Sequence, residues 1–183
     1  MVACAVSAVE SPRDLLDRCV AGDAAAWRSL HLRYHQNALS VLRRLGVAPS
    51  QLEDACQEVF CDVFQYLPRF RHEADFRTWL YRICAGHARA ARRRARVWSF
   101  LADWLPISGQ SSGESLEEGQ ASRQLAKAIE QLSEAERVVF VLFELEGLSG
   151  KDIAEVIRRP QSTVFRRLHD ARKRFAAVLE DAG

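Results

Sequence analysis

The stretch FRTWLYRICAGHARAARRRARVW, residues 76–98, holds Trp79, Tyr81 and Trp98 together with seven arginines and no acidic residue. An ordinary surface helix interleaves both signs of charge, so this composition predicts a helix that meets a polyanion. The start of the stretch is apolar and its end is rich in arginine. Two roles are open for Trp79 and Tyr81: they are core residues at helical spacing, or flat partners for unstacked nucleic-acid bases.

Charge is unevenly distributed along the 183 residues, whose formal net charge is only +2. Residues 1–96 carry 15 basic and 10 acidic side chains, and residues 158–174 have a net charge of +6. Residues 97–122, between them, carry four acidic and no basic side chains. Two basic patches around an acidic spacer predict a polyanion bound in two places. Arginine supplies 23 of the 26 cations, which suits phosphate and base contacts, although a GC-rich genome produces the same bias.

The five cysteines, Cys4, Cys19, Cys56, Cys61 and Cys84, include no CxxC pair. An odd number spread through helical patterns predicts reduced thiols rather than a disulfide framework. Cys56 and Cys84 stand where apolar residues suit the helix pattern, so they are expected to be buried structural thiols rather than part of a metal or redox site with Cys61, His72 and His87. The sequence has no quartet of zinc ligands, no glycine-rich phosphate loop and no nucleophile motif. We therefore expect no catalytic residue, no metal, no cofactor and no small-molecule substrate.

The first ten residues, MVACAVSAVE, are apolar but lack a basic leader. They are too short for a signal peptide or a membrane span, and no other run approaches twenty apolar residues. The expectation is a cytoplasmic protein with no membrane insertion.

The spacing of apolar residues predicts an all-α chain, because no run alternates apolar and polar residues between hairpin turns. Asp23 is expected to cap a helix that Gly46 stops. Ser50 and Glu53 have the spacing of a capping box for the next helix, over 51–67. The expected inward stripe of that helix is Ala55, Val59, Phe60, Val63, Phe64 and Leu67.

Two small helical domains are expected, over residues 10–97 and 123–180, with a flexible acidic linker over 98–122. Residues 106–122 are rich in Ser, Gly and Glu, which is typical of a linker. The aromatic segment 98–105 either covers the core of the first domain or docks on a partner.

The second domain contains several residues that are expected to begin or end helices. Ser133 and Glu136 have the spacing of a capping box. Gly147 is expected to close the apolar helix that follows. Ser149 and Asp152 are then expected to cap a short third helix.

The end of the second domain completes a helix-turn-helix pattern, in which a short turn joins two helices and the second is rich in arginine. Pro160 is expected to interrupt the helical conformation, and Ser162 is expected to cap a last helix over 163–179. Its expected inward residues are Val164, Leu168, Ala171, Phe175 and Val178. Its expected exposed residues are Phe165, Arg166, Arg167, His169, Asp170, Arg172 and Lys173. Early side chains of such a helix reach base edges, and later ones reach phosphates.

Three segments carry a resemblance to a known family. DACQEVFCDVFQYLPRFRHEADFRTWLYRI, residues 54–83, resembles region 2 of the extracytoplasmic-function (ECF) group of bacterial sigma factors. AGDAAAWRSLHLRYH, residues 21–35, is similar to the opening of that region. QLSEAERVVFVLFELEGLSGKDIAEVIRRPQSTVFRRLHDARKRF, residues 131–175, resembles region 4. The resemblance covers nearly the whole chain in the right order.

The resemblance implies a transcription initiation factor and not an enzyme. Such a protein binds the β′ clamp helices and β subunit of core RNA polymerase, recognises the −35 and −10 promoter elements and melts promoter DNA. It implies core binding by Asp54, Gln57, Glu58 and Asp62. It implies −10 binding and melting by Arg69, Phe70, Arg71, Arg77, Trp79, Tyr81, Arg82, Gly86, Arg89 and Arg93. It implies −35 binding by Ser162, Thr163, Phe165, Arg166, Arg167, His169, Asp170 and Lys173.

Further expectations follow from the same resemblance. The loop over residues 69–75 is expected to pocket a base flipped from the −10 element, at a cost of about a few kcal/mol. An anti-sigma factor is expected to clamp between the two domains and to hold the protein at the inner membrane.

The chain departs from the family pattern at five positions. Gly86 stands where asparagine is common, and Ala90 where an acidic residue is common. Arg158 replaces the usual glycine of the helix-turn-helix. Phe165 and Asp170 replace basic residues of the recognition helix, so the −35 sequence is expected to differ from the group's common one.

Asp170 has three possible environments, because its carboxylate repels phosphate. It pairs with Arg166 or Arg174 at helical spacing, which is the favoured arrangement, or accepts from cytosine N4, or points to solvent. A rival function for the whole chain is a stand-alone helix-turn-helix regulator that binds duplex DNA without polymerase.

Overall fold

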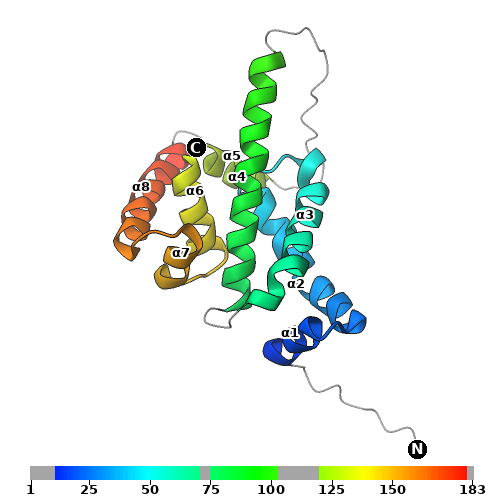
Figure 1. Cartoon of the computed structure of the whole chain (residues 1–183). Helices are drawn as coiled ribbons and strands as arrows, with labels where there is room; N and C mark the ends of the chain where they lie inside the picture. The colour runs from blue at the N-terminus through cyan, green and yellow to red at the C-terminus, as the bar shows by residue number, and fades with distance from the viewer. Residues whose placement is uncertain (1–10, 71–74, 103–119, 181–183) are drawn as a thin grey trace, which may run out of the picture.

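The computed structural model describes residues 11–70, 75–102 and 120–180, and every regular element in these ranges is helical (Figure 1). The expected all-α fold is therefore confirmed. The first domain contains α1 Pro12–Val20, α2 Ala24–Arg44, α3 Leu52–Tyr66 and α4 Phe76–Ala102. The second contains α5 Gln120–Glu130, α6 Glu134–Phe140, the π-helical turn η3 Val141–Leu145, α7 Gly150–Ile157 and α8 Gln161–Glu180.

Helix α2 begins and ends as its sequence predicts. The Asp23 carboxylate accepts from the amides of Ala25 and Ala26 at 2.8 and 3.2 Å. The Arg18 guanidinium donates to the same carboxylate, and these hydrogen bonds lower the pKa of Asp23. Gly46 follows the helix at φ +89°, a left-handed conformation that glycine adopts without strain.

Helix α3 departs from the prediction at its start and on one flank. The capping box of Ser50 and Glu53 is wrong, because residues Pro49–Gln51 form a 3₁₀ turn and Gln51, without a side-chain hydrogen bond, occupies the N-cap. Phe64, expected inside, is 63% exposed. Its ring packs on Trp27 of α2, with centroids 4.8 Å apart, so it covers the core edge from outside.

The second domain follows most of its predicted boundaries. Ser133 and Glu136 form the expected capping box, and the Ser149 hydroxyl accepts from the Asp152 amide. The Ser162 cap is wrong, because α8 begins at Gln161, two residues before the expected start at 163, and Ser162 lies inside the helix. The amides of Thr163 and Val164 donate to the Pro160 carbonyl instead.

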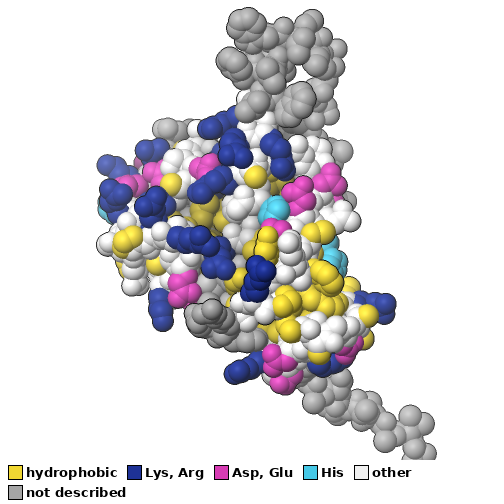
Figure 2. Space-filling view, viewed as in Figure 1, with side chains coloured by type: hydrophobic (Ala, Val, Ile, Leu, Met, Phe, Trp, Pro, Cys, Tyr) yellow, Lys and Arg dark blue, Asp and Glu magenta, His cyan; other side chains and the backbone are white. Residues whose placement is uncertain are grey.

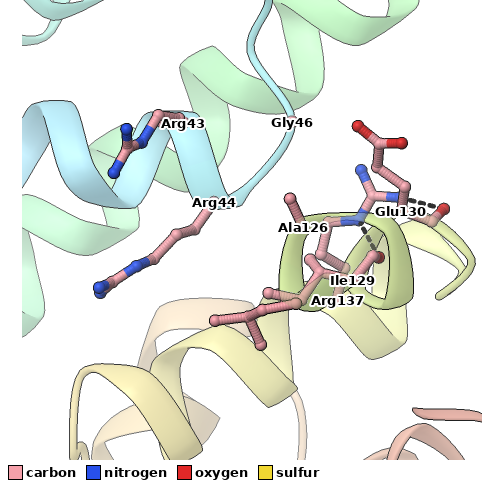
Figure 3. Close-up of a pocket in the computed structure, with 8 residues that line it drawn as sticks. Arg43, Arg44, Gly46, Ala126, Ile129, Glu130 and Arg137 are labelled. Carbon is pink, nitrogen blue, oxygen red and sulfur yellow. Dashed lines mark hydrogen bonds between the residues drawn. The ribbon is translucent and has the colours of Figure 1, made fainter. Parts of the chain in front are cut away.

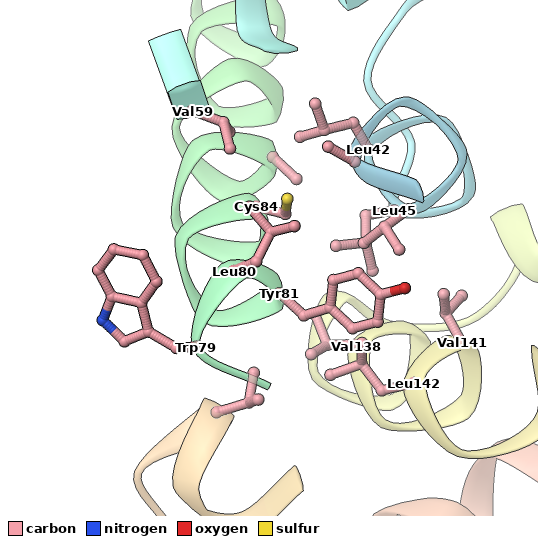
Figure 4. Close-up of a cluster of buried hydrophobic side chains, with 14 of the residues drawn as sticks. Leu42, Leu45, Val59, Trp79, Leu80, Tyr81, Cys84, Val138, Val141 and Leu142 are labelled. Carbon is pink, nitrogen blue, oxygen red and sulfur yellow. The ribbon is translucent and has the colours of Figure 1, made fainter. Parts of the chain in front are cut away.

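A single hydrophobic cluster runs through both domains, with the long helix α4 between them (Figure 1). The Tyr81 ring of α4 lies among Leu45 at the end of α2 and Val138 and Leu142 of the second domain (Figure 4). Helix α7 also packs along α4. The two domains therefore share one core in this arrangement.

Two glycines give opposite stability predictions. A Cβ added at Gly86, inside α4, meets no atom within 4 Å, so Gly86→Ala is expected to raise the free energy of unfolding by about 1 kcal/mol. A Cβ at Gly46 lies 2.5 Å from Nη1 of Arg137 and 2.8 Å from Nη1 of Arg92, at positive φ. Gly46→Ala is therefore expected to lower that free energy by about 1–3 kcal/mol.

Urea unfolding followed by far-UV circular dichroism measures both changes on the full chain. Each variant serves as the control for the other, because both add the same methyl group. If the free energy of unfolding changed in the same direction in both variants, the environments assigned to Gly86 and Gly46 would be contradicted.

Candidate polymerase and nucleic-acid interface

The polar face of α3 is exposed and acidic. Asp54, Gln57 and Glu58 are exposed and Asp62 is half-buried, as an interface with another protein requires. His87 of α4 lies between two of these carboxylates, with Nδ1 3.1 Å from Glu58 and Nε2 2.8 Å from Asp62. Sequence reasoning did not identify this role for His87, because its partners lie 29 and 25 residues away along the chain.

The aromatic residues around the start of α4 form a packed cluster. Trp79 is 9% exposed, and its ring centroid lies 5.2 Å from that of Phe70 and 5.6 Å from that of Phe76. Tyr34 of α2 adds an edge contact to Phe76 at 4.8 Å. The interpretation of Trp79 as a core residue therefore holds in this arrangement. Phe70 is half-buried at the edge of this cluster.

Tyr81 is fully buried, so in this arrangement it too is a core residue. Its hydroxyl donates to Oε2 of Glu146 in the second domain at 2.8 Å. Burial, with this hydrogen bond to a carboxylate, raises the pKa of the Tyr81 phenol.

The arginines of α4 form a basic face beside this cluster, and Lys and Arg side chains gather over α4 and α8 in Figure 2. Arg82 is half-buried, and Arg69 and Arg93 are exposed. The Arg77 guanidinium lies 5.9 Å from the centroid of the Tyr81 ring. Arg89 pairs with Glu134 of the second domain at 2.6 Å. Arg71, another expected member, and the rest of the loop 71–74 lie outside the described residues.

The helix-turn-helix places its expected recognition face outward. Exposed residues of α8 include Ser162, Phe165, Arg166, His169, Asp170 and Lys173, while Thr163 and Arg167 are half-buried. The inward stripe is also as expected: Val164, Leu168 and Ala171 are buried, and Phe175 and Val178 are half-buried.

Two departures from the family pattern have structural consequences inside the helix-turn-helix. Arg158 adopts φ 51° and ψ 50°, the left-handed conformation that explains why glycine is usual there. Phe165 covers Gly150 at the start of α7, where an added Cβ would lie 2.8 Å from its ring. Phe165 therefore holds the two helices together while half of its surface stays exposed.

The favoured intrahelical pair of Asp170 is not formed in this structure. Nε of Arg174 lies 3.5 Å from Glu136. No ion pair joins Asp170 to any side chain within residues 120–180 or elsewhere in the described part of the chain. Its carboxylate is exposed on the recognition face, which leaves base contact or solvent.

Arg137 is a buried cation that the sequence patterns did not single out. It is 4% exposed, and its guanidinium donates to the carbonyls of Ile129, Glu130 and Leu132 at 3.0, 2.7 and 3.2 Å. The carbonyls of Ile129 and Glu130 lie in the last turn of α5, where carbonyls need donors from outside the helix, and that of Leu132 follows just after it. Figure 3 shows Arg137 beside the end of α5, in a hollow that Gly46 and Arg43 also line.

Three of the four described cysteines are buried, including Cys56 and Cys84, for which burial was expected. Cys19, Cys56 and Cys84 are buried and Cys61 is exposed. Burial raises the pKa of the Cys56 thiol to about 11 and raises that of Cys84 as well. Within the described ranges, no group of three or more His, Cys, Asp or Glu residues could hold a metal ion. No helix in those ranges combines the length and the apolar character of a bilayer span.

Comparisons with known proteins agree with this architecture. Residues 30–97 match the family described as sigma-70 region 2, and residues 122–175 match sigma-70 region 4. The RNA polymerase sigma-H factor of Pseudomonas aeruginosa is 30% identical, over 93% of this chain and 95% of its own length. The ECF RNA polymerase sigma-E factor of Escherichia coli is 32% identical, over 87% of this chain and 89% of its own length.

Two solved structures share the fold. CnrH, solved in complex with the cytosolic domain of CnrY, has a TM-score of 0.72 and 22% identity, over 93% of this chain and 98% of the solved chain. The sigma factor RpoE of Bartonella quintana, solved with the anti-sigma factor NepR, has a TM-score of 0.70 and 18% identity, over 84% of this chain and 96% of the solved chain. With both family regions in order and relatives matched over most of their length, the chain belongs to the ECF group of the sigma-70 family of RNA polymerase sigma factors.

Proposed function

We propose that this chain binds core RNA polymerase through the acidic face of α3 and recognises −10 and −35 promoter elements through α4 and α8. The observation that carries the proposal is the presence of one exposed acidic helix face and two separate arginine-rich helix faces in a single chain. Arginine suits phosphate contacts and bidentate contacts to guanine. Asp54, Gln57, Glu58 and Asp62 form the polymerase-binding set.

Promoter melting is assigned to the start of α4 and the loop before it. Separated strands need cations for their phosphates and flat partners for their bases. Arg69, Arg77 and Arg82 supply cations near the Phe70 and Trp79 rings. Because Tyr81 is fully buried and Trp79 is only 9% exposed, both residues hold α4 in place here, and the stacking surface falls to half-buried Phe70.

The chain is also proposed to bind an anti-sigma factor. The solved structures of the same fold are sigma factors bound to CnrY and NepR, which is a property of those proteins. We extend it to this chain as a proposal, with retention of the sigma factor at the inner membrane through its partner. Affinity purification of the tagged chain from resting and stressed cells tests it, and recovery of polymerase subunits alone in both conditions would argue against it.

Transcription from a promoter library tests the main proposal. Purified core polymerase is assayed with and without the chain, and core-dependent transcripts are expected only when the chain is present, from promoters that share two spaced elements. A stand-alone regulator gives a different result: tight duplex binding without core and no transcripts that depend on the chain.

Asp170→Arg is predicted to change binding at the −35 element. The substitution removes an exposed carboxylate from the recognition face and adds a cation, so non-specific affinity should rise and the salt dependence should steepen by up to about one phosphate contact. If Asp170 accepts from cytosine, discrimination at one −35 position should also fall by about 1–3 kcal/mol. Base-substitution profiling of the −35 element with both proteins decides this, and identical preferences eliminate readout by Asp170.

A further inference from the structure

Four arginines gather around one hollow beside the end of α2 (Figure 3). The hollow has a volume of about 180 Å³, and its lining includes Arg43 and Arg44 of α2, Gly46, and Arg137 of α6. Arg92 of α4 reaches the same place, because its Nη1 lies 2.8 Å from the position that a Cβ on Gly46 would occupy. Three helices that are distant in the sequence therefore direct cations to a single small space.

The positive charge around this hollow exceeds the negative charge. Glu146 pairs with Arg44, and exposed Glu130 lines the hollow. In the described part of the chain, no ion pair joins Arg92 or Arg137 to a carboxylate. The guanidinium groups of Arg44, Arg92 and Arg137 already outnumber the two carboxylates, without counting the remaining arginine.

Arg137 is the most buried of these cations, with only 4% of its surface exposed. Its Nε and Nη2 donate to three carbonyls around the end of α5, which carry only partial negative charge. Its Nη1 takes no part in these bonds and lies 2.5 Å from the position of a Cβ on Gly46, at the lining of the hollow. A buried cation without a full counter-charge is unfavourable, so an anion in the hollow would stabilise the folded chain.

Arg92 and Arg137 also bring two like charges close together. Both Nη1 atoms lie within 2.8 Å of the same point beside Gly46, so they are at most about 5.6 Å apart. Two cations at this separation repel each other. A phosphate group accepts charge-assisted hydrogen bonds from two guanidinium groups at once and replaces this repulsion by attraction. Because Gly46 has no side chain, the place where the two groups meet stays open.

We propose that this hollow binds the phosphate group of a small molecule, with Arg92 and Arg137 as the groups that contact it. Sites for whole drug-sized ligands usually have volumes of about 300–1,000 Å³, so a hollow of about 180 Å³ suits a phosphate or diphosphate group. Leu125 and Ile129 of α5 line the same hollow and offer an apolar surface to the organic part of a phosphate ester. The site lies outside the proposed polymerase, −10 and −35 sets, so the inference does not rest on the proposed function.

Isothermal titration calorimetry of the full chain with pyrophosphate tests the site, at an ionic strength held constant with sodium chloride. Arg92→Gln removes one cation from the hollow, and its amide still offers a donor to the Leu45 carbonyl that Arg92 contacts at 3.3 Å. The matched control is Arg28→Gln, which removes the same charge from an exposed position on α2, about 24 Å along the helix from Arg44.

The unmodified chain is expected to bind one pyrophosphate per chain. Arg92→Gln should weaken this binding at least about tenfold, because it removes a direct contact, and Arg28→Gln should weaken it less than about twofold, because salt screens a distant charge. Arg43→Gln provides a second variant of the hollow that is expected to fold normally, because Arg43 is exposed. The absence of one-to-one binding overturns the site. Equal affinities in the hollow variants and in Arg28→Gln also overturn it, because the anion then binds to the arginine-rich helix faces.

Thermal unfolding gives a second measurement on the same proteins. A ligand that binds the folded chain raises its Tm as the ligand concentration rises above Kd. Pyrophosphate should therefore raise the Tm of the unmodified chain and of Arg28→Gln, and should have a smaller effect on Arg92→Gln at the same concentration. An equal rise in all three proteins contradicts a site at this hollow.

A nucleoside diphosphate in place of pyrophosphate identifies the source of the phosphate group. Tighter binding than that of pyrophosphate, weakened by Arg92→Gln, assigns the hollow to a nucleotide whose organic part contacts Leu125 and Ile129. Binding no tighter than that of pyrophosphate, with the same dependence on Arg92, assigns it to the free anion. Both results support the site, whereas nucleotide binding that does not depend on Arg92 counts against it.

Discussion

Lysine at positions 58 and 62 in place of glutamate and aspartate is expected to lower the affinity of the chain for core RNA polymerase by about 100-fold, or about 3 kcal/mol. The reversal places two cations where the proposal puts an acidic contact face. The fold should survive, because Glu58 is exposed and Asp62 only half-buried. Titration of labelled chain with core polymerase measures the affinity.

Two further variants sharpen this experiment. Glu58→Gln with Asp62→Asn keeps the side-chain shapes and should cost less than the reversal, because it removes attraction without adding repulsion. Glu53→Lys reverses a charge on the first turn of the same helix, at a residue that is not in the proposed set and whose carboxylate lies 3.8 Å from Nε2 of His35 on α2, so it should lower the affinity far less than the double reversal. Unchanged core binding in the double lysine variant would count against the assigned face.

Arg137→Ala is expected to lower the free energy of unfolding by about 4 kcal/mol. Two of the carbonyls that Arg137 satisfies are in buried contacts, and an unsatisfied buried acceptor costs about 1–3 kcal/mol. Loss of the packed side chain adds to this cost. Because a domain is stable by only about 5–15 kcal/mol, the loss is a large share of the total.

The matched control for this change is Arg172→Ala. Arg172 pairs with Glu144, but its side chain is 55% exposed, so its loss should cost at most about 1 kcal/mol. Arg137→Lys should recover only part of the stability, because one ammonium cannot reproduce the planar fork that reaches three carbonyls. Denaturant unfolding of the full chain measures all three, and equal losses for Arg137→Ala and Arg172→Ala would rule out the capping role.

Local sequence patterns predicted the features that depend on neighbours within a helical turn or two. The Ser133 and Glu136 capping box forms as expected, because its two members lie three residues apart in the chain. The inward stripe of α8 also follows from helical spacing. The Ser50 box failed although its spacing is identical, because Pro49 begins a 3₁₀ turn and moves the helix start past Ser50.

Other features of the site depend on where distant helices pack. Helical spacing alone left two roles open for Trp79 and Tyr81. It also predicted that Phe64 is buried, although the packing of α1 and α2 leaves this side chain 63% exposed. His87 between two acidic residues of α3 and Arg137 at the end of α5 have partners that no local pattern identifies.

The all-α class, the order of the two sigma regions and the two arginine-rich helices could be predicted from residue type and short spacing alone. The shared core of the two domains, and the contact of Glu146 with the first domain, became visible only once the helices were packed together. These contacts join residues far apart in the chain, because Glu146 meets Tyr81 across 65 residues and Arg44 across 102. Burial of that carboxylate exists only when three separate helical segments come together.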